Sequence, residues 1–166
     1  MAINFPEGTQ NFPCKIVQVV SGTYSTQVSQ ASNGSANPQT TLTDTGLSAA
    51  ITPKQASNKV LVLVTQQYGF DNNDRQNHWN FLLRDASNNV LYNTTSGGEG
   101  SLRYKMLAAF YSYWNLSLLH HPNTTSSFTY KVSMNFLVSY GGGDTMYAQR
   151  NSRRSDITLL EVEAWI

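Results

Sequence analysis

TLTDTGLSAAITPKQASNKVLVLVT, residues 41–65, predicts a strand, a turn and a second strand. Leu47, Ala49 and Ile51 alternate with small or polar residues, as in a strand that buries one face. Pro53 lacks a backbone donor and should end that strand, and a polar segment follows it. The unbroken apolar segment 60–64 predicts a second strand, buried on both faces. This stretch therefore indicates an all-β protein.

The same kind of pattern continues along the rest of the chain. Its longest example is residues 128–140, where apolar and polar residues alternate and only Leu137 breaks the polar set. Residues 85–89 have turn chemistry, and residues 68–77 predict a polar loop. Further strands are expected at 15–20, 78–84, 90–93, 114–119, 146–150 and 157–166. A weak edge strand is expected within 22–38. For residues 102–113, a strand is favoured over a helix. Eight or more strands with turns about every ten residues predict an antiparallel β-sandwich.

The composition fits one folded domain and excludes several function classes. The chain has 166 residues, of which 40% are hydrophobic and only 13% charged, about half the usual charged share. A net charge of +1 provides no general attraction for nucleic acid or an anionic membrane, and we expect neither nucleic-acid binding nor membrane insertion. The single cysteine, Cys14, excludes an intrachain disulfide. The chain carries no secretory signal pattern.

No motif in the sequence predicts catalysis, a metal or a cofactor. The GxSxG, Walker and GxGxxG patterns are absent. Residues 71–74, DNND, resemble half of a calcium loop but lack its glycine and distal glutamate. His120 and His121 should point to opposite faces of a strand and so not chelate one ion. Glu161 and Glu163 share a face of the last predicted strand, where we expect a solvated edge. We therefore expect no enzyme activity.

The candidate functional residues are those of contact surfaces. Tyr and Trp beside neutral polar loops suit sugar faces and protein interfaces, so the loops around 68–79 and 96–113 are the expected contact surface. The candidate receptor contacts are Tyr68, Phe70, Asp71, Asn72, Asn73, Arg75, Trp79, Tyr111, Tyr113 and Trp114. Residues 1–13 predict a docking arm ahead of a domain at 14–166. The candidate oligomer or virion contacts are Ile3, Phe5, Phe12, Arg153, Arg154, Trp165 and Ile166.

Several segments together resemble one known family. The segments are KIVQVVSGTYST (15–26), DTGLSAAITP (44–53), SNKVLVLV (57–64), NFLLRDASNNVL (80–91), LSLLHHPNTTSSFTYKVSM (116–134) and ITLLEVEAWI (157–166). They resemble the jelly-roll domains of tailed-bacteriophage virion proteins, which are tail-fibre tips and accessory structural proteins. The segments cover most of the chain, and their motifs are framework turns and core positions. The positions of Arg84, Asp85, Pro122 and Asn123 look structural in that family.

The resemblance implies a jelly roll like tumour-necrosis-factor and complement head domains, assembled as a homotrimer on a virion in the host cytoplasm. It implies a non-enzymatic tail fibre or tip protein for host attachment, held to other virion proteins by its arm and in contact with a host glycan or protein. Because the chain shows no stalk or large anchor, a capsid decoration protein is the close alternative. A carbohydrate-binding lectin outside any virus is the third.

Overall fold

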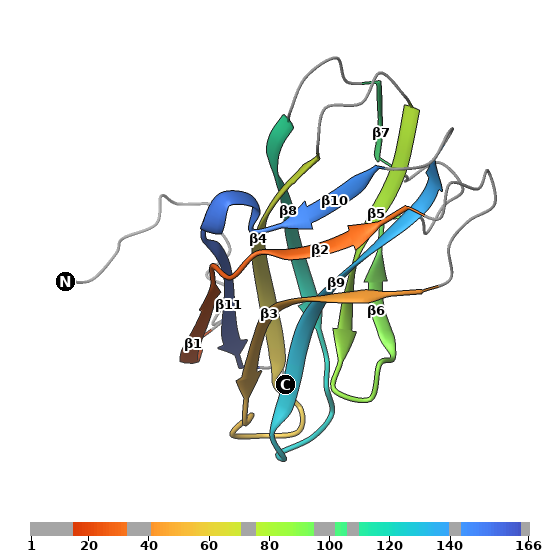
Figure 1. Ribbon diagram of the computed structural model, residues 1–166. Coiled ribbons are helices and arrows are strands. Elements are labelled where there is room, and N and C mark those ends of the chain that lie inside the picture. Colours follow the sequence, from red (N-terminus) through yellow and green to blue (C-terminus); the bar gives the residue numbers. More distant parts are fainter. Residues whose placement is uncertain are drawn as a thin grey trace, which may run out of the picture.

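The computed structural model describes residues 15–32, 41–70, 76–94, 102–105, 110–139 and 144–163, which form two packed antiparallel sheets (Figure 1). The first sheet contains β1 (Ile16–Tyr24), β2 (Val28–Ala31), β4 (Lys59–Phe70), β8 (Phe110–His120), β10 (Thr145–Ala148) and β11 (Ser155–Val162). The second contains β3 (Thr43–Ile51), β5 (Gln76–Asp85), β6 (Val90–Asn93), β7 (Leu102–Lys105) and β9 (Phe128–Ser139). A 3-10 turn, η1 (Arg150–Ser152), lies between β10 and β11.

The order of the strands is that of a jelly roll. β4 pairs with β8 along its whole length, while its other side pairs first with β11 and then with β10. β1 and β2 continue the sheet beyond β11 and β10. The order β1-β11-β4-β8 in one sheet therefore faces β3-β9-β5-β6 in the other. The predicted all-β antiparallel sandwich is confirmed.

The core lies between the two sheets and is built by the period-two alternation of each strand. Leu47 and Ile51 face inward from β3, as predicted, and meet the inward valines of β4. The other buried apolar side chains include Phe81, Leu83, Tyr130, Val132, Met134, Ile157 and Leu159. Burying a side chain of this size stabilises a fold by roughly 1.5 to 3 kcal/mol. The core is thus the main source of stability.

Two expectations about β4 are wrong. Residues 60–64 are not buried on both faces, because Leu63 faces outward and is 38% exposed. Tyr68 to Phe70 do not begin a polar loop, since they pair with Ser112 to Phe110 and extend β4. Of the rest of the predicted loop at 68–77, Gln76 and Asn77 belong to β5, and residues 71–75 lie outside the described residues.

Other boundaries differ from the prediction by a few residues. β1 continues to Tyr24, and β11 ends at Val162. Residues 102–105 and 110–113 form strands, which agrees with the predicted preference for strand over helix at 102–113. The turn at 85–89 is confirmed, with the Asn89 backbone N–H donating to Asp85 Oδ1 at 2.8 Å. Asn88 in this turn has a φ of 71°, which an asparagine tolerates.

A bulge in β3 allows the two sheets to close at one edge. The pairing of β3 with β9 changes register between Asp44 and Ser48, and Gly46 in this gap has a φ of +84°. The ring of Tyr24, from β1, lies against Gly46, so that a Cβ there would be 2.3 Å from Tyr24 Cε1. Glycine is therefore required by both the backbone angle and the contact.

Replacing Gly46 with alanine should lower the free energy of unfolding by about 2 to 4 kcal/mol, because left-handed backbone is costly for an L-residue and the methyl group would overlap Tyr24. Urea denaturation followed by tryptophan fluorescence measures this. Ser48→Ala, an exposed position on the same strand, is the control and should change stability by less than about 0.5 kcal/mol. Equal stabilities of the two variants would contradict this account of the bulge.

Candidate functional site

Four of the aromatic residues expected to contact a receptor belong to the core. Tyr68, Phe70, Trp79 and Trp114 are each at most 8% exposed. Their rings pack on one another and on Phe81, with centroid distances of 4.3 Å for Phe70–Trp79 and 5.2 Å for Phe81–Trp114. The prediction that they contact a receptor is wrong, because each continues the inward alternation of its strand rather than standing in a loop.

The remaining candidates are divided between the surface and the undescribed segments. Tyr111 and Tyr113 lie on the outer face of β8 and are 37% and 49% exposed. Arg153 and Arg154 are exposed in the turn before β11. The candidates outside the described residues are Ile3, Phe5, Phe12, Asp71, Asn72, Asn73, Arg75, Trp165 and Ile166.

An exposed apolar row crosses the outer face of the first sheet. Val19, Leu160, Leu61 and Leu119 are successive partners on β1, β11, β4 and β8, and their side chains point away from the core. Val19 and Leu119, at the two ends of the row, are 56% and 53% exposed. Leu63 adds to this surface from the next outward position of β4. We call these five residues the apolar row. Contiguous exposed apolar patches are common at interaction sites, which makes the apolar row a candidate contact surface.

The surface beside the apolar row is polar but nearly neutral. The hydroxyls of Ser21 and Thr158 hydrogen-bond to each other at 3.3 Å. Thr65 Oγ1 donates to Asn115 Oδ1 at 3.0 Å. Asp156 pairs with Arg154, Nε to Oδ1 at 2.6 Å. These groups already have partners on their own sheet, so a second protein can cover the row without leaving them unsatisfied.

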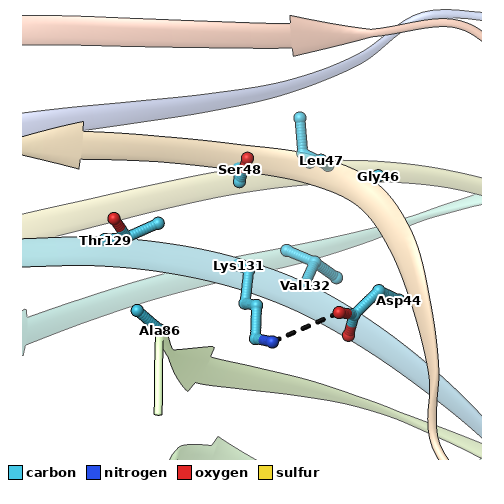
Figure 2. Close-up of a pocket in the computed structure, with 8 residues that line it drawn as sticks. All are labelled: Asp44, Gly46, Leu47, Ser48, Ala86, Thr129, Lys131 and Val132. Carbon is cyan, nitrogen blue, oxygen red and sulfur yellow. Dashed lines mark hydrogen bonds and ion pairs between the residues drawn. The ribbon is translucent and has the colours of Figure 1, made fainter. Parts of the chain in front are cut away.

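A pocket of about 300 Å³ opens on the outer face of the second sheet, beside the β3 bulge (Figure 2). Asp44 and Ser48 from β3 and Lys131 from β9 border it, with Ala86 from the β5–β6 turn at one side. Lys131 Nζ donates to Asp44 Oδ2 at 3.2 Å, which is the dashed contact in the figure. This volume is at the lower limit of small-ligand sites.

The charged side chains at this pocket are paired with one another. Buried Arg84 pairs through Nη2 with Asp44 Oδ1, and its Nε donates to Ser133 Oγ at 2.8 Å. Burial raises the pKa of Asp44, but hydrogen bonds from Ser133 and Lys131 and the charges of Arg84 and Lys131 outweigh burial and lower that pKa below its ordinary value. Two cations thus share one carboxylate, and the cluster fastens β3, β5 and β9 together. Arg84 has the structural role that the resemblance implies.

A second polar cluster lies on the outer face of the first sheet, on β8 beyond the apolar row. The Arg150 guanidinium carbon lies 5.0 Å from the ring centroid of Tyr111 and 5.1 Å from that of Tyr147. Tyr111 and Tyr147 both pair with Gly69 of β4, one from each side, and the Arg150 guanidinium packs against both rings. The Arg153 guanidinium lies 4.9 Å from the Tyr111 ring. Sequence patterns missed this cluster because its members are distant in the chain.

The turn that carries these arginines has strained backbone. Gln149, Asn151 and Ser152 have φ values of 50°, 56° and 56°, uncommon for residues other than glycine. The Gln149 N–H donates to the Gln67 carbonyl at 3.0 Å, and the Asn151 N–H donates to Gln27 Oε1 at 2.9 Å. Neighbouring strands therefore fix a conformation that the turn would not adopt alone.

Glu161 does not lie at a solvated edge. β11 is an interior strand between β1 and β4, and Glu161 points inward with no exposed surface. Its carboxylate accepts hydrogen bonds from Gln18 Nε2 at 2.6 Å, Asn58 Nδ2 at 2.6 Å and the Lys54 N–H at 2.7 Å. Burial raises the pKa of Glu161, but these donors and the Gln55 N–H outweigh it and lower that pKa. Glu163, just beyond β11, is exposed.

The histidines contact different partners. His120 Nδ1 lies 2.9 Å from the Tyr130 hydroxyl, and His121 Nε2 lies 2.9 Å from the Ala56 carbonyl. Within the described residues, no three His, Cys, Asp or Glu side chains gather closely enough to hold a metal ion. No helix in the described part of the chain is long and apolar enough to span a membrane.

Comparisons with known proteins give only distant structural likenesses. No protein-family model matches the chain, and no curated protein matches it. It is similar to a chain of the infectious bursal disease virus Gx strain, with a TM-score of 0.45 and 10% identity over 100% of this chain and 41% of that chain. It is also similar to the D431N mutant VP2 protein of infectious bursal disease virus in T=1 particles, with a TM-score of 0.42 and 13% identity over 88% of this chain and 36% of that chain. The chain thus spans less than half the length of these viral chains. At TM-scores below 0.5, we take nothing about function from this likeness.

Replacing Glu161 with glutamine should lower the free energy of unfolding by about 2 to 3 kcal/mol at neutral pH. The carboxylate accepts hydrogen bonds from buried donors, and the amide of glutamine has one acceptor oxygen instead of two and no charge. In the wild type the pKa of Glu161 is lower in the folded state than its ordinary value near 4.5. The stabilisation by the ionised Glu161 is therefore complete above pH 4.5 and is lost as pH falls through the folded-state pKa. The difference between wild type and variant should therefore narrow below about pH 4.5, measured by urea denaturation from pH 7 to 3. A constant difference would contradict this role, since Asp44 and Asp85 titrate equally in both proteins.

Proposed function

We propose that the protein is a non-enzymatic structural protein of a bacteriophage virion, a homotrimer that serves as a tail fibre or tip protein in host attachment. The observation that carries this proposal is the apolar row on the outer face of the β1-β11-β4-β8 sheet. A sheet face of this kind fits a second copy of the same chain, because its neighbouring polar groups already have partners and Asp156 is paired with Arg154.

Closed cyclic assembly accounts for one face being apolar. In a ring of identical copies, each subunit presents the same surface toward the axis, and no copy is left with an uncovered row. Three copies are the number that the family resemblance implies for this strand order. The second sheet, with its ion-paired pocket, and the upper part of β8, with Tyr111 and Tyr113, would then remain outside the assembly.

The partners of two carboxylates, Glu161 and Asp44, support a structural role for both. Glu161 is occupied by three hydrogen-bond donors, and Asp44 by two cations and Ser133. General acid–base catalysis needs carboxyl groups that reach a substrate. These two are instead committed to holding strands together, which is the chemistry of a framework.

The tail position rests on the family resemblance and on the exposed Tyr111 and Tyr113, which suit contact with a host surface. Capsid decoration is the second candidate. It is favoured by the apolar residues Ile3, Phe5 and Phe12 in residues 1–13, which would dock such a protein on a shell or on another virion protein.

Light scattering on the purified protein should give a mass about three times that of the 18.4 kDa chain. Val19→Ser in the apolar row should dissociate this species, because each copy would lose apolar contact area at the axis. Val90→Ser is the matched control, since Val90 is 51% exposed on β6 of the other sheet. A wild-type monomer, or equal masses for the two variants, would contradict assembly through the row.

Gold-labelled antibody against the protein should bind the tails of intact particles, and the purified protein should slow adsorption of those particles to host cells. Label on the heads, with adsorption unchanged, would overturn the attachment role and support decoration. Adding an unrelated jelly-roll protein at the same concentration controls for crowding in the adsorption measurement.

A further inference from the structure

We propose that the upper part of β8 and the η1 turn form a binding site for a carboxylate-bearing sugar unit of a surface polysaccharide. The site consists of Tyr111, Tyr113, Arg150, Asn151 and Arg153. This inference deepens the proposed attachment function and rests on it for its setting. The structure brings together two residues expected at a receptor surface and one expected at a subunit contact, from segments distant in the chain.

Positive charge is concentrated at Tyr111. The guanidinium carbons of Arg150 and Arg153 lie 5.0 and 4.9 Å from the same ring centroid, which puts them within about 10 Å of each other. The adjacent Arg154 pairs with Asp156, whereas no carboxylate of the described residues pairs with Arg153. The Arg153 guanidinium is exposed, so it can approach an anionic ligand. A guanidinium fork matches a planar carboxylate.

The sugar part of the ligand is suggested by Tyr113. Tyr113 follows Tyr111 on the same outward face of β8, about 7 Å further along the strand, and is 49% exposed. An exposed tyrosine offers an apolar ring face to the C–H groups of a sugar and a hydroxyl to its polar groups. A pyranose ring on Tyr113 would therefore lie next to Tyr111, the ring against which both arginines pack.

The turn is already held in position for binding. Asn151 Nδ2 donates to the Tyr111 hydroxyl at 2.8 Å, and the Asn151 N–H donates to Gln27. The left-handed φ values at Gln149, Asn151 and Ser152 are maintained by these contacts and by the Gln67 carbonyl. Backbone strain of this kind gathers at ligand sites, because a fixed loop loses little entropy on binding.

Calorimetric titration with 3′-sialyllactose and tri-galacturonate tests the proposal, with lactose and galactotriose as the neutral counterparts. The acidic probes should bind, and the neutral ones should bind at least ten-fold more weakly. Arg153→Gln and Tyr113→Ser should each weaken acidic binding about ten-fold or more. Arg154→Gln is the matched control, because it removes the same charge from the next residue, and should change affinity less than two-fold.

The same measurements can overturn the proposal. The proposal is wrong if the wild-type protein binds neither acidic probe, or if it binds acidic and neutral probes with equal affinity. It is also wrong if Arg153→Gln and Arg154→Gln lose equal affinity for the acidic probes. Tighter binding of a phosphodiester polymer or duplex DNA than of the sugars would overturn the choice of carboxylate. If the wild-type protein and Arg153→Gln block adsorption equally, the sugar site is contradicted but the attachment function is supported. If the sugars bind but adsorption is unaffected, attachment fails while the site stands.

Discussion

The hydrogen bonding of β4 on both sides is the constraint on which the rest of the structure depends. β8 pairs with β4 along its full length, and β11 and β10 share its other side. Its inward side chains from Val60 to Phe70 then form the middle of the core, and its outward positions are divided into two regions. Because side chains alternate with period two, shifting β4 by one residue would exchange these faces and expose the core.

Two carboxylates secure the strands that surround β4. Glu161, which is buried, connects β11 to β1 and to the β3–β4 connection through its three donors. Asp44, which is exposed, connects β3 to β5 and β9 through buried Arg84 and through Lys131. Leaving the buried charge of Glu161 or Arg84 without these partners would be costly, so each cluster penalises alternative pairings of the strands it joins. Both carboxylates thus serve the fold.

The outer face of the first sheet separates two kinds of recognition. Its lower part, from Val19 to Leu119, is apolar and suits a surface that remains covered. Its upper part carries the η1 turn, which places the Arg150 guanidinium against the rings of Tyr111 and Tyr147. This turn separates β10 from β11, which pair with successive parts of β4, and it brings charged side chains to this end of the sheet.

The sequence by itself determined the strands, because alternation is a local property. It predicted the burial of Leu47 and Ile51, the turn at 85–89 and the antiparallel sandwich, all of which the structure confirms. It placed Tyr68 in a loop and assigned Trp79, in a predicted strand beside that loop, to the contact surface, since isolated aromatics beside Asn and Gln carry no information about where a strand ends. Only the tertiary structure decided that Glu161 is buried and that Tyr111 meets Arg150 and Arg153, because these relations depend on which strands become neighbours and on the register between them.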